Sequence, residues 1–107
     1  MLITTTPRIA NKKIVKTLGL VRGNTIQTRW IGRDIAAGLK TFVGGEIKGY
    51  TEMISRARDQ ALRRMLKEAK DKGADAVVSV RFTTSTIMGG AAEILAYGTA
   101  VKLQNQE

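Results

Sequence analysis

The stretch that decides the fold is residues 49–72, GYTEMISRARDQALRRMLKEAKDK. Apolar side chains recur in it every three or four residues, and this spacing places them on one face of an α-helix. The stripe comprises Ile47, Tyr50, Ile54, Ala57, Ala61 and Met65, flanked by Met53, Leu62, Leu66 and Ala69. Charged residues occupy the other face, and pairs such as Asp59 and Arg63 place the acid four positions before the base, which favours a helix. The pattern predicts one long amphipathic helix over about 49–72.

The chain after this helix predicts two β-strands. Gly73 is suited to end the helix, because glycine adopts the left-handed conformation of the residue after a helix at little cost. Residues 76–86 and 94–103 alternate between two sets of side chains, as strands do, and 87–92 are predicted to connect them. Gly98, inside the second strand, indicates a bulge or the close approach of another backbone.

The chain before the helix predicts a hairpin. Residues 14–22 and 25–31 are rich in β-branched and aliphatic side chains. Gly23 and Asn24 between them suit a two-residue turn, because glycine accepts the positive φ that a type II′ turn requires. Residues 2–6 predict a further short strand.

A short helix and a glycine pair precede the long helix. Residues 35–43 have a helical pattern that Asp34 is placed to begin, and Gly44 and Gly45 are predicted to break it. The order of these elements predicts a single α+β domain over residues 1–107, with a mostly antiparallel sheet packed on one long helix.

The composition excludes several kinds of chemistry. The 107 residues include 18 Lys and Arg against 9 Asp and Glu, a formal net charge of +9, and they include neither Cys nor His. Without those two residue types there is no disulfide, no Cys/His zinc site and no Ser-His or Cys-His catalysis. The chain has no apolar run long enough to span a membrane and no N-terminal secretory pattern. We therefore expect a cytoplasmic protein with no membrane partner, no cofactor and no enzymatic activity.

The strand 94–103 offers a surface for assembly. Ile94, Ala96, Gly98 and Ala100 form one face of it, and this face is small and apolar. One long helix covers only one side of a sheet, whereas antiparallel sheets usually present a polar face to water. We therefore expect these four residues to contact another copy of the chain. The alternative is that the short helix or the N-terminal segment covers them within one subunit.

The charge is concentrated near the N-terminus, which favours binding of phosphate or nucleic acid. Residues 1–33 contain seven basic residues and no acidic one. The candidate contacts are Lys12, Lys13, Lys16, Arg22, Arg29 and Arg33. No RNP-like aromatic pattern, zinc finger or helix-turn-helix spacing accompanies them. The alternative is a solvated surface that keeps an oligomer soluble.

Three carboxylates are candidates for cation binding or acid/base chemistry. They are Asp34, Glu46 and Glu93. Hard cations such as Mg²⁺ and Ca²⁺ take oxygen ligands, and two facing carboxylates are the usual pair in hydrolysis. The sequence does not bring these three together by any known spacing, and salt bridges or helix capping are the alternative roles.

Five short motifs, in this order along the chain, resemble those of the YbjQ-like family of small uncharacterised bacterial and archaeal proteins. They are LGLVRG at 18–23, VGGE at 43–46 with Tyr50, Ala57-Arg58 with Ala61, KGADAV at 72–77 and YGTAV at 97–101. The resemblance covers residues 2–103 and implies a dodecin-like α+β subunit that assembles as a homopentamer. It implies no catalytic residue. It implies structural roles for Gly23, Gly44, Gly45, Gly73 and Gly98.

Members of this family are commonly labelled heavy-metal-binding. This sequence has no thiol or imidazole, the ligands that soft metal ions prefer, so we do not expect a heavy-metal centre in it. The sequence as a whole predicts a non-enzymatic cytoplasmic homo-oligomer, a pentamer if the resemblance holds, that binds an unidentified ligand. Metal binding through oxygen ligands, and phosphate or nucleic-acid binding through the basic N-terminal third, are the alternatives.

Overall fold

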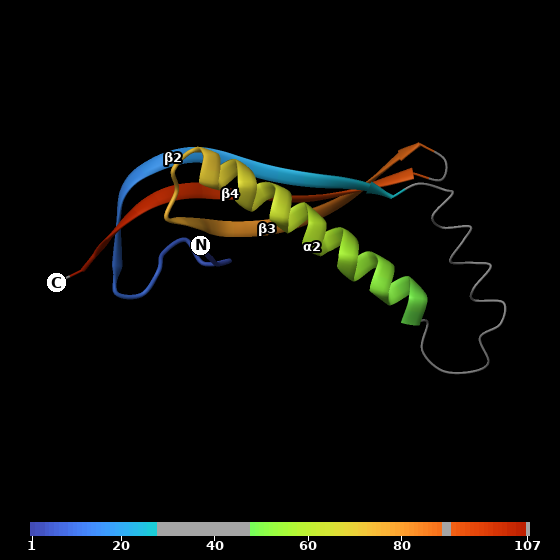
Figure 1. Ribbon diagram of the computed structural model, residues 1–107, viewed down its shortest axis with the longest axis horizontal. Coiled ribbons are helices and arrows are strands. Elements are labelled where there is room, and N and C mark those ends of the chain that lie inside the picture. Colours follow the sequence, from blue (N-terminus) through green and yellow to red (C-terminus); the bar gives the residue numbers. More distant parts are fainter. Residues whose placement is uncertain (28–47, 89–90, 107) are drawn as a thin grey trace.

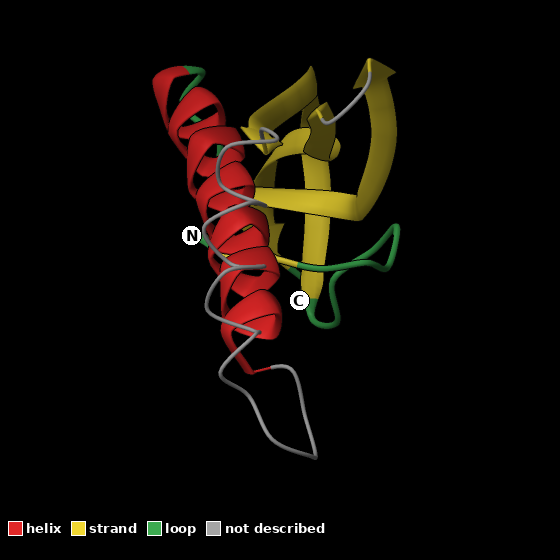
Figure 2. Ribbon diagram, turned by 90° about the vertical axis from the view of Figure 1, so that its right-hand side faces the viewer, coloured by secondary structure: helices red, strands yellow, loops and turns green. Residues whose placement is uncertain are grey.

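The computed structural model describes residues 1–27, 48–88 and 91–106. Its elements, in chain order, are β1 (Leu2–Ile3), β2 (Lys12–Gln27), α2 (Lys48–Asp71), β3 (Ala76–Met88) and β4 (Ala91–Asn105) (Figure 1). The strands form one sheet in the order β1-β3-β4-β2, and α2 lies against one of its faces (Figure 2). The chain is therefore α+β, with a mixed four-stranded sheet and one helix in the part that the structure describes.

The central strand β4 holds the sheet together. It pairs antiparallel with both β2 and β3 along almost its whole length. β1 is parallel to β3 and pairs through Leu2 and Ile3. In chain order α2 lies between β2 and β3, the two strands that flank β4, and it packs on one face of the sheet that they form.

The helix α2 buries the apolar face that its sequence spacing predicts. Ala57, Ala61, Met65 and Ala69 follow one another at intervals of four residues, and each is at most 3% exposed. The helix ends just before Gly73, which has φ +78° and donates its N–H to the Lys70 carbonyl at 2.9 Å. It runs over Lys48–Asp71, against the predicted span of 49–72.

The predicted hairpin around Gly23 and Asn24 is wrong. Both residues lie inside the continuous strand β2, where they pair with Ala96 and Leu95 of β4. The glycine is needed for contact with α2, because a Cβ on Gly23 would lie 2.3 Å from the Ala61 carbonyl oxygen. A long strand partner therefore overrides the local turn signal. Within the second strand predicted, residues 28–31 lie outside the described residues.

The predicted short helix over 35–43, with Gly44 and Gly45 after it, also lies outside the described residues. The predicted connection over 87–92 is wrong at both ends, because β3 continues to Met88 and β4 begins at Ala91. Met88 and Ala91 pair with each other, so the ladder between these strands extends almost to their junction. Ladder hydrogen bonds therefore satisfy the backbone at these two strand ends, although two glycines follow Met88 in the sequence.

Four irregularities interrupt the strand ladders, and one of them is an extra residue in β3 between Thr86 and Met88. β2 carries one extra residue between Ile14 and Lys16 and another between Thr17 and Gly19, where Gly19 has φ +110°. β3 carries an extra residue between Val78 and Arg81, beside Ser79 with φ +53°. Bulges increase strand twist and curvature, and Figure 1 shows β2 curving sharply near its N-terminal end.

The face of β4 that we expected to meet another copy meets α2 instead. Ile94, Ala96 and Ala100 are buried in the same core as Ala57, Ala61 and Met65 of the helix. Gly98 belongs to this face as well, and a Cβ on it would lie 2.8 Å from Val77 Cγ1. The physical reason is size: α2 presents alanines, so its backbone comes close to the sheet, and only small residues fit opposite them.

A second, smaller core occupies one end of the opposite face. Ala76 and Val78 of β3 and Val101 of β4 are buried there. Ile9, from the N-terminal segment, packs over them together with Ile14 and Leu103. The N-terminal segment therefore covers this end of the sheet within one subunit. The sequence allowed such a cover as an alternative, but for the opposite face of β4.

Candidate functional site

The rest of the sheet face opposite α2 forms rows of residues from three strands. Tyr97 of β4 lies between Arg22 of β2 and Arg81 of β3 in the strand register. Paired residues of antiparallel strands project to the same side, so this row combines one aromatic ring with two cations. The neighbouring rows are Asn24, Leu95 and Thr83, then Ile26, Glu93 and Ser85, and on the other side Leu20, Thr99 and Val78.

Apolar side chains on these rows remain open to solvent. Leu20 is 56% exposed and Ile26 is 51% exposed, whereas Val21 between them, on the α2 side, is fully buried. Leu95 and Tyr97 are half-buried. The two exposures show that nothing in the described residues covers this part of the face, which we call the open face (Leu20, Arg22, Asn24 and Ile26 of β2 with Glu93, Leu95, Tyr97 and Thr99 of β4).

Two strand edges next to the open face have no partner strand in the described ranges, although the Asn24 and Leu20 carbonyls of β2 accept hydrogen bonds from the Arg64 and Lys72 side chains. β2 lies at the end of the sheet order and pairs only through its β4 side. On β3, the N-terminal segment bonds as far as Val80, whose N–H donates to the Thr4 carbonyl at 3.0 Å. Beyond that point, residues 81–88 pair only with β4. Unpaired strand edges readily accept a further strand.

Glu93 is the one predicted cation ligand that the structure describes. Its Oε2 accepts a hydrogen bond from Asn24 Nδ2 at 3.0 Å, and the two side chains line a hollow of about 270 Å³ with Arg22 and Leu95. Asp34 and Glu46 lie outside the described residues. Among residues 1–27, 48–88 and 91–106, no three Asp or Glu side chains come together as a metal site would require. Glu93 therefore lies beside a cation and an amide, which is the setting of a hydrogen-bonded surface carboxylate.

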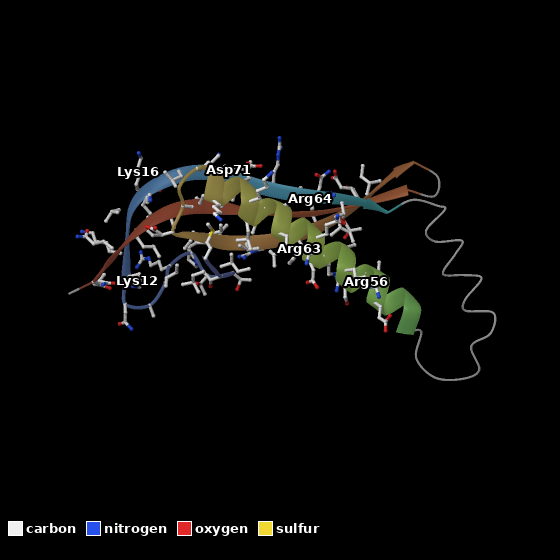
Figure 3. The ribbon with its side chains drawn as sticks, viewed as in Figure 1. Lys12, Lys16, Arg56, Arg63, Arg64 and Asp71 are labelled. Atoms are coloured by element: carbon white, nitrogen blue, oxygen red, sulfur yellow. The ribbon has the colours of Figure 1, made fainter. Side chains whose placement is uncertain are left out.

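The predicted basic residues do not form a single cluster. Lys12 and Lys13 line a hollow at the start of β2, together with Arg8, which sequence reasoning counted in the basic segment but did not select. Lys16 pairs in register with Lys102, away from that hollow. Figure 3 shows Lys12 and Lys16 well separated along the bend of β2, with Lys16 pointing outward.

Arg22 is isolated from these lysines because it lies on the open face, further along β2. Arg29 and Arg33 lie outside the described residues. The long helix carries further cations, among them Arg56, Arg63 and Arg64, which Figure 3 shows along its length. Arg56 lies 3.8 Å from Glu52, and the Arg64 guanidinium donates to the Asn24 carbonyl, so both have partners.

Comparison with known proteins places this α+β chain in a family. The sequence model of the YbjQ family, described as "Putative heavy-metal-binding", matches residues 1–104. A UPF0145 protein of Photobacterium profundum is 59% identical over 103 residues, which cover 96% of this chain and 100% of the relative. UPF0145 proteins of Thermotoga maritima and Methanosarcina acetivorans are 59% and 57% identical, over 97% and 99% of this chain and 98% and 100% of their own lengths.

The chain therefore belongs to the YbjQ family, and its resemblance to that family is confirmed. Its fold is similar to the crystal structure of a protein of unknown function, of the DUF74 family, from Pediococcus pentosaceus. The TM-score is 0.63 at 18% identity, over 97% of this chain and 98% of the other. At that identity the likeness concerns the fold alone.

The residues of this chain do not match the description of the family as heavy-metal-binding. Heavy-metal ions are held in proteins mainly by thiolate and imidazole ligands, and the whole sequence contains neither Cys nor His. The single described candidate, Glu93, supplies one hard oxygen ligand that already accepts a hydrogen bond. The residues of this chain do not fit a heavy-metal centre. In the described residues, no helix is both long and apolar enough to cross a membrane.

Proposed function

We propose that this chain is the subunit of a cytoplasmic homo-oligomer that serves as a binding protein rather than an enzyme. The observation that carries the proposal is the open face, where Leu20 and Ile26 are each more than half exposed beside the half-buried Leu95 and Tyr97. Apolar groups gathered on one face of a small protein mark a contact surface, because burying them releases ordered water. The contact surface is thus the opposite side of β4 from the one predicted.

The two strand edges that have no partner strand among the described residues support the same proposal. The stretch 18–27 of β2 and the stretch 81–88 of β3 each contain one charged residue, Arg22 and Arg81. Natural edge strands that must stay single carry several charges or a proline to prevent pairing. Because the two edges belong to different strands, joining one to the other makes a head-to-tail contact, and such contacts form a ring when the rotation between subunits closes.

A ring is also the form that the family resemblance implies, as a homopentamer. The proposal that the oligomer binds rather than catalyses rests on the sequence, which lacks both His and Cys. The remaining acid/base groups in the described chain are carboxylates, amines, guanidinium groups and tyrosine phenols. Glu93 accepts a hydrogen bond from Asn24 and lines a hollow with Arg22, and no second carboxylate lines that hollow.

The experiment that tests assembly measures subunit number by native mass spectrometry and light scattering. The wild-type chain is expected to be an oligomer, five-fold if the family number holds. Leu20→Lys places a charge on the open face and is expected to produce monomers that remain folded by circular dichroism, because the site is solvent-exposed in the subunit.

The matched control is Phe82→Lys. Phe82 is 47% exposed, about as much as Leu20, but it pairs with Ala96 and so lies on the α2 side of the sheet. This variant is expected to keep the wild-type mass. A monomeric wild type would overturn the proposal of assembly. Dissociation by Phe82→Lys with none by Leu20→Lys would show that the contact lies on the other face.

A further inference from the structure

The N-terminal loop and the start of β2 line an open hollow with a volume of about 460 Å³. Three cations line it, Arg8, Lys12 and Lys13, and its other lining residues are uncharged. Neither the assembly contact proposed above nor the family description uses this hollow. We propose that it is a binding site for a small phosphate-bearing anion, such as a diphosphate or polyphosphate group.

The charges of this loop hollow (lined by Arg8, Lys12 and Lys13) are not neutralised within the described chain. None of the three cations lies within 4.0 Å of a described carboxylate, since the ion pairs there are Arg56 with Glu52 and Lys102 with Asp75. Asp75 lines a separate hollow with Lys12. Its two oxygens already face the Leu103 N–H at 2.8 Å and the Lys102 ammonium at 3.9 Å.

The loop is held in place before any ligand arrives. Asn11 adopts a left-handed conformation with φ +64°, and its carbonyl accepts the Gln106 N–H at 3.2 Å. The Lys12 N–H donates to the Ile9 carbonyl at 3.2 Å, and the Lys12 ammonium donates to the side-chain oxygen of Asn105. These contacts fasten the loop backbone and the Lys12 ammonium to the end of β4, so less ordering entropy is lost when a ligand binds.

The lining decides which part of a ligand is recognised. It contains no aromatic side chain, so a nucleobase has no ring on which to stack. Arginine and lysine hydrogen bond to phosphate oxygens by charge-assisted contacts, which are stronger than neutral ones. The volume is in the range of small-molecule sites, which is about 300–1,000 Å³. The hollow therefore suits a compact polyanion that is recognised by its phosphates and independently of any base.

The test is calorimetric titration of the intact protein with pyrophosphate, ATP and adenosine at low and high salt. Pyrophosphate and ATP are expected to bind with similar affinity and to compete, adenosine is expected not to bind, and binding should weaken as salt rises. Arg8→Gln and Lys13→Gln are each expected to weaken pyrophosphate about tenfold, because each removes one charge-assisted hydrogen bond. Both residues are exposed, so the folded state is expected to persist.

The matched control is Lys16→Gln, which removes the same charge from β2 at a position outside the loop hollow. It is expected to change the affinity by less than about twofold, as a distant exposed charge is screened by salt. Equal weakening by Lys16→Gln and Arg8→Gln would overturn the site, because the attraction would then be the general charge of the protein. Absence of heat with pyrophosphate, or binding of adenosine, would overturn it too.

A single-stranded oligonucleotide added to the pyrophosphate complex distinguishes the sources of the phosphate. Competition that Arg8→Gln abolishes would identify nucleic-acid phosphates as ligands of the same cations, and lack of competition would identify free phosphate compounds. The masses of the variants are measured in parallel. If a variant loses pyrophosphate binding but keeps the oligomer mass of the wild type, the loss concerns this site alone. The test of the site is therefore independent of the test of assembly.

Discussion

Gly23 of β2 lies in direct backbone contact with Ala61 of α2. A Cβ on Gly23 would come within 2.3 Å of the Ala61 carbonyl oxygen, and within the same distance of the Met65 amide nitrogen. Two neighbouring contacts join the same strand and helix, because Thr25 Oγ1 donates to the Ala57 carbonyl at 3.3 Å and the Arg64 guanidinium donates to the Asn24 carbonyl. The helix thus packs on β2 at Gly23, a residue that has no side chain.

Replacing Gly23 with alanine is expected to destabilise the fold strongly. The atoms that would clash belong to the helix backbone, so no change of side-chain rotamer relieves them and α2 must move. Overpacking of a core usually costs about 1–3 kcal/mol and sometimes more, and a backbone clash belongs at the upper end. Urea unfolding followed by circular dichroism, at equal protein concentrations, measures the loss.

Gly19→Ala is the control for this variant. Gly19 has no atom within 4 Å of its Cβ position, and its φ of +110° is the reason for glycine there. It is expected to lose about 1–3 kcal/mol from backbone strain, without displacement of α2. A Gly23→Ala protein as stable as the wild type would contradict the close seating of the helix on β2.

Gly98 and Val77 are expected to be energetically coupled. A Cβ on Gly98 would lie 2.8 Å from Val77 Cγ1 and 3.1 Å from Val80 Cγ2. Gly98→Ala should therefore cost about 1–3 kcal/mol, and Val77→Ala should cost a similar amount by leaving a cavity. In the double variant the added methyl group enters the space that the valine left. Its destabilisation should be smaller than the sum of the two by about 1 kcal/mol or more. Additive costs in the double-mutant cycle would show that the two sites do not meet.

Asp75 is expected to stabilise the junction between α2 and β3 by a hydrogen bond more than by its charge. Its Oδ2 accepts the Leu103 N–H at 2.8 Å, while Lys102 is 3.9 Å from Oδ1 at an exposed site. Asp75→Ala should cost about 1 kcal/mol, because a backbone donor loses its partner. Asp75→Asn keeps an acceptor and removes only a weak surface ion pair, so it should lie within a few tenths of a kcal/mol of the wild type. Equal losses in thermal unfolding would assign the effect to the charge.

Heavy-metal ions are expected not to bind this chain in stoichiometric amount. The sequence supplies no thiolate or imidazole, and Glu93 is already hydrogen bonded to Asn24. Protein incubated with Zn²⁺ and then desalted should retain well under one ion per subunit by elemental analysis. Its Tm should be the same with Zn²⁺ and with a chelator, because only ions that bind the folded state raise stability. One retained ion per subunit with a raised Tm would support the family description, and Glu93→Gln would then test Glu93 as a ligand.

Some features of the fold follow from local sequence patterns, and others follow from contacts between residues distant in sequence. The apolar period of four residues at Ala57, Ala61 and Met65 is visible in the sequence, and these side chains are the buried face of α2. The pair Gly23-Asn24 shows the limit of such reasoning. A turn signal reports which conformations a dipeptide tolerates, whereas the register with Ala96 and Leu95 required it to stay extended.

The candidate site was less predictable than the fold. Alternation along β4 separated Ile94, Ala96 and Ala100 from Leu95 and Tyr97, but both sets are largely apolar. The sequence pattern predicts that the set with the smaller side chains, Ile94, Ala96 and Ala100, contacts a partner subunit. In the structure these side chains pack against the alanine face of α2, where only small residues fit. The position of the basic residues was also hard to predict. They are close in sequence, but they lie apart in the structure because two bulges bend β2.

By itself the sequence determined where the long helix α2 lies and which side chains of α2 and β4 share a face, because both depend on spacing along a regular backbone. It also determined what chemistry is absent, since the chain has no thiol and no imidazole. Only the tertiary structure decided which face of β4 meets α2 and that Gly23 lies inside a strand. Each of these depends on a partner distant in sequence, and no local pattern of residues carries the position of that partner.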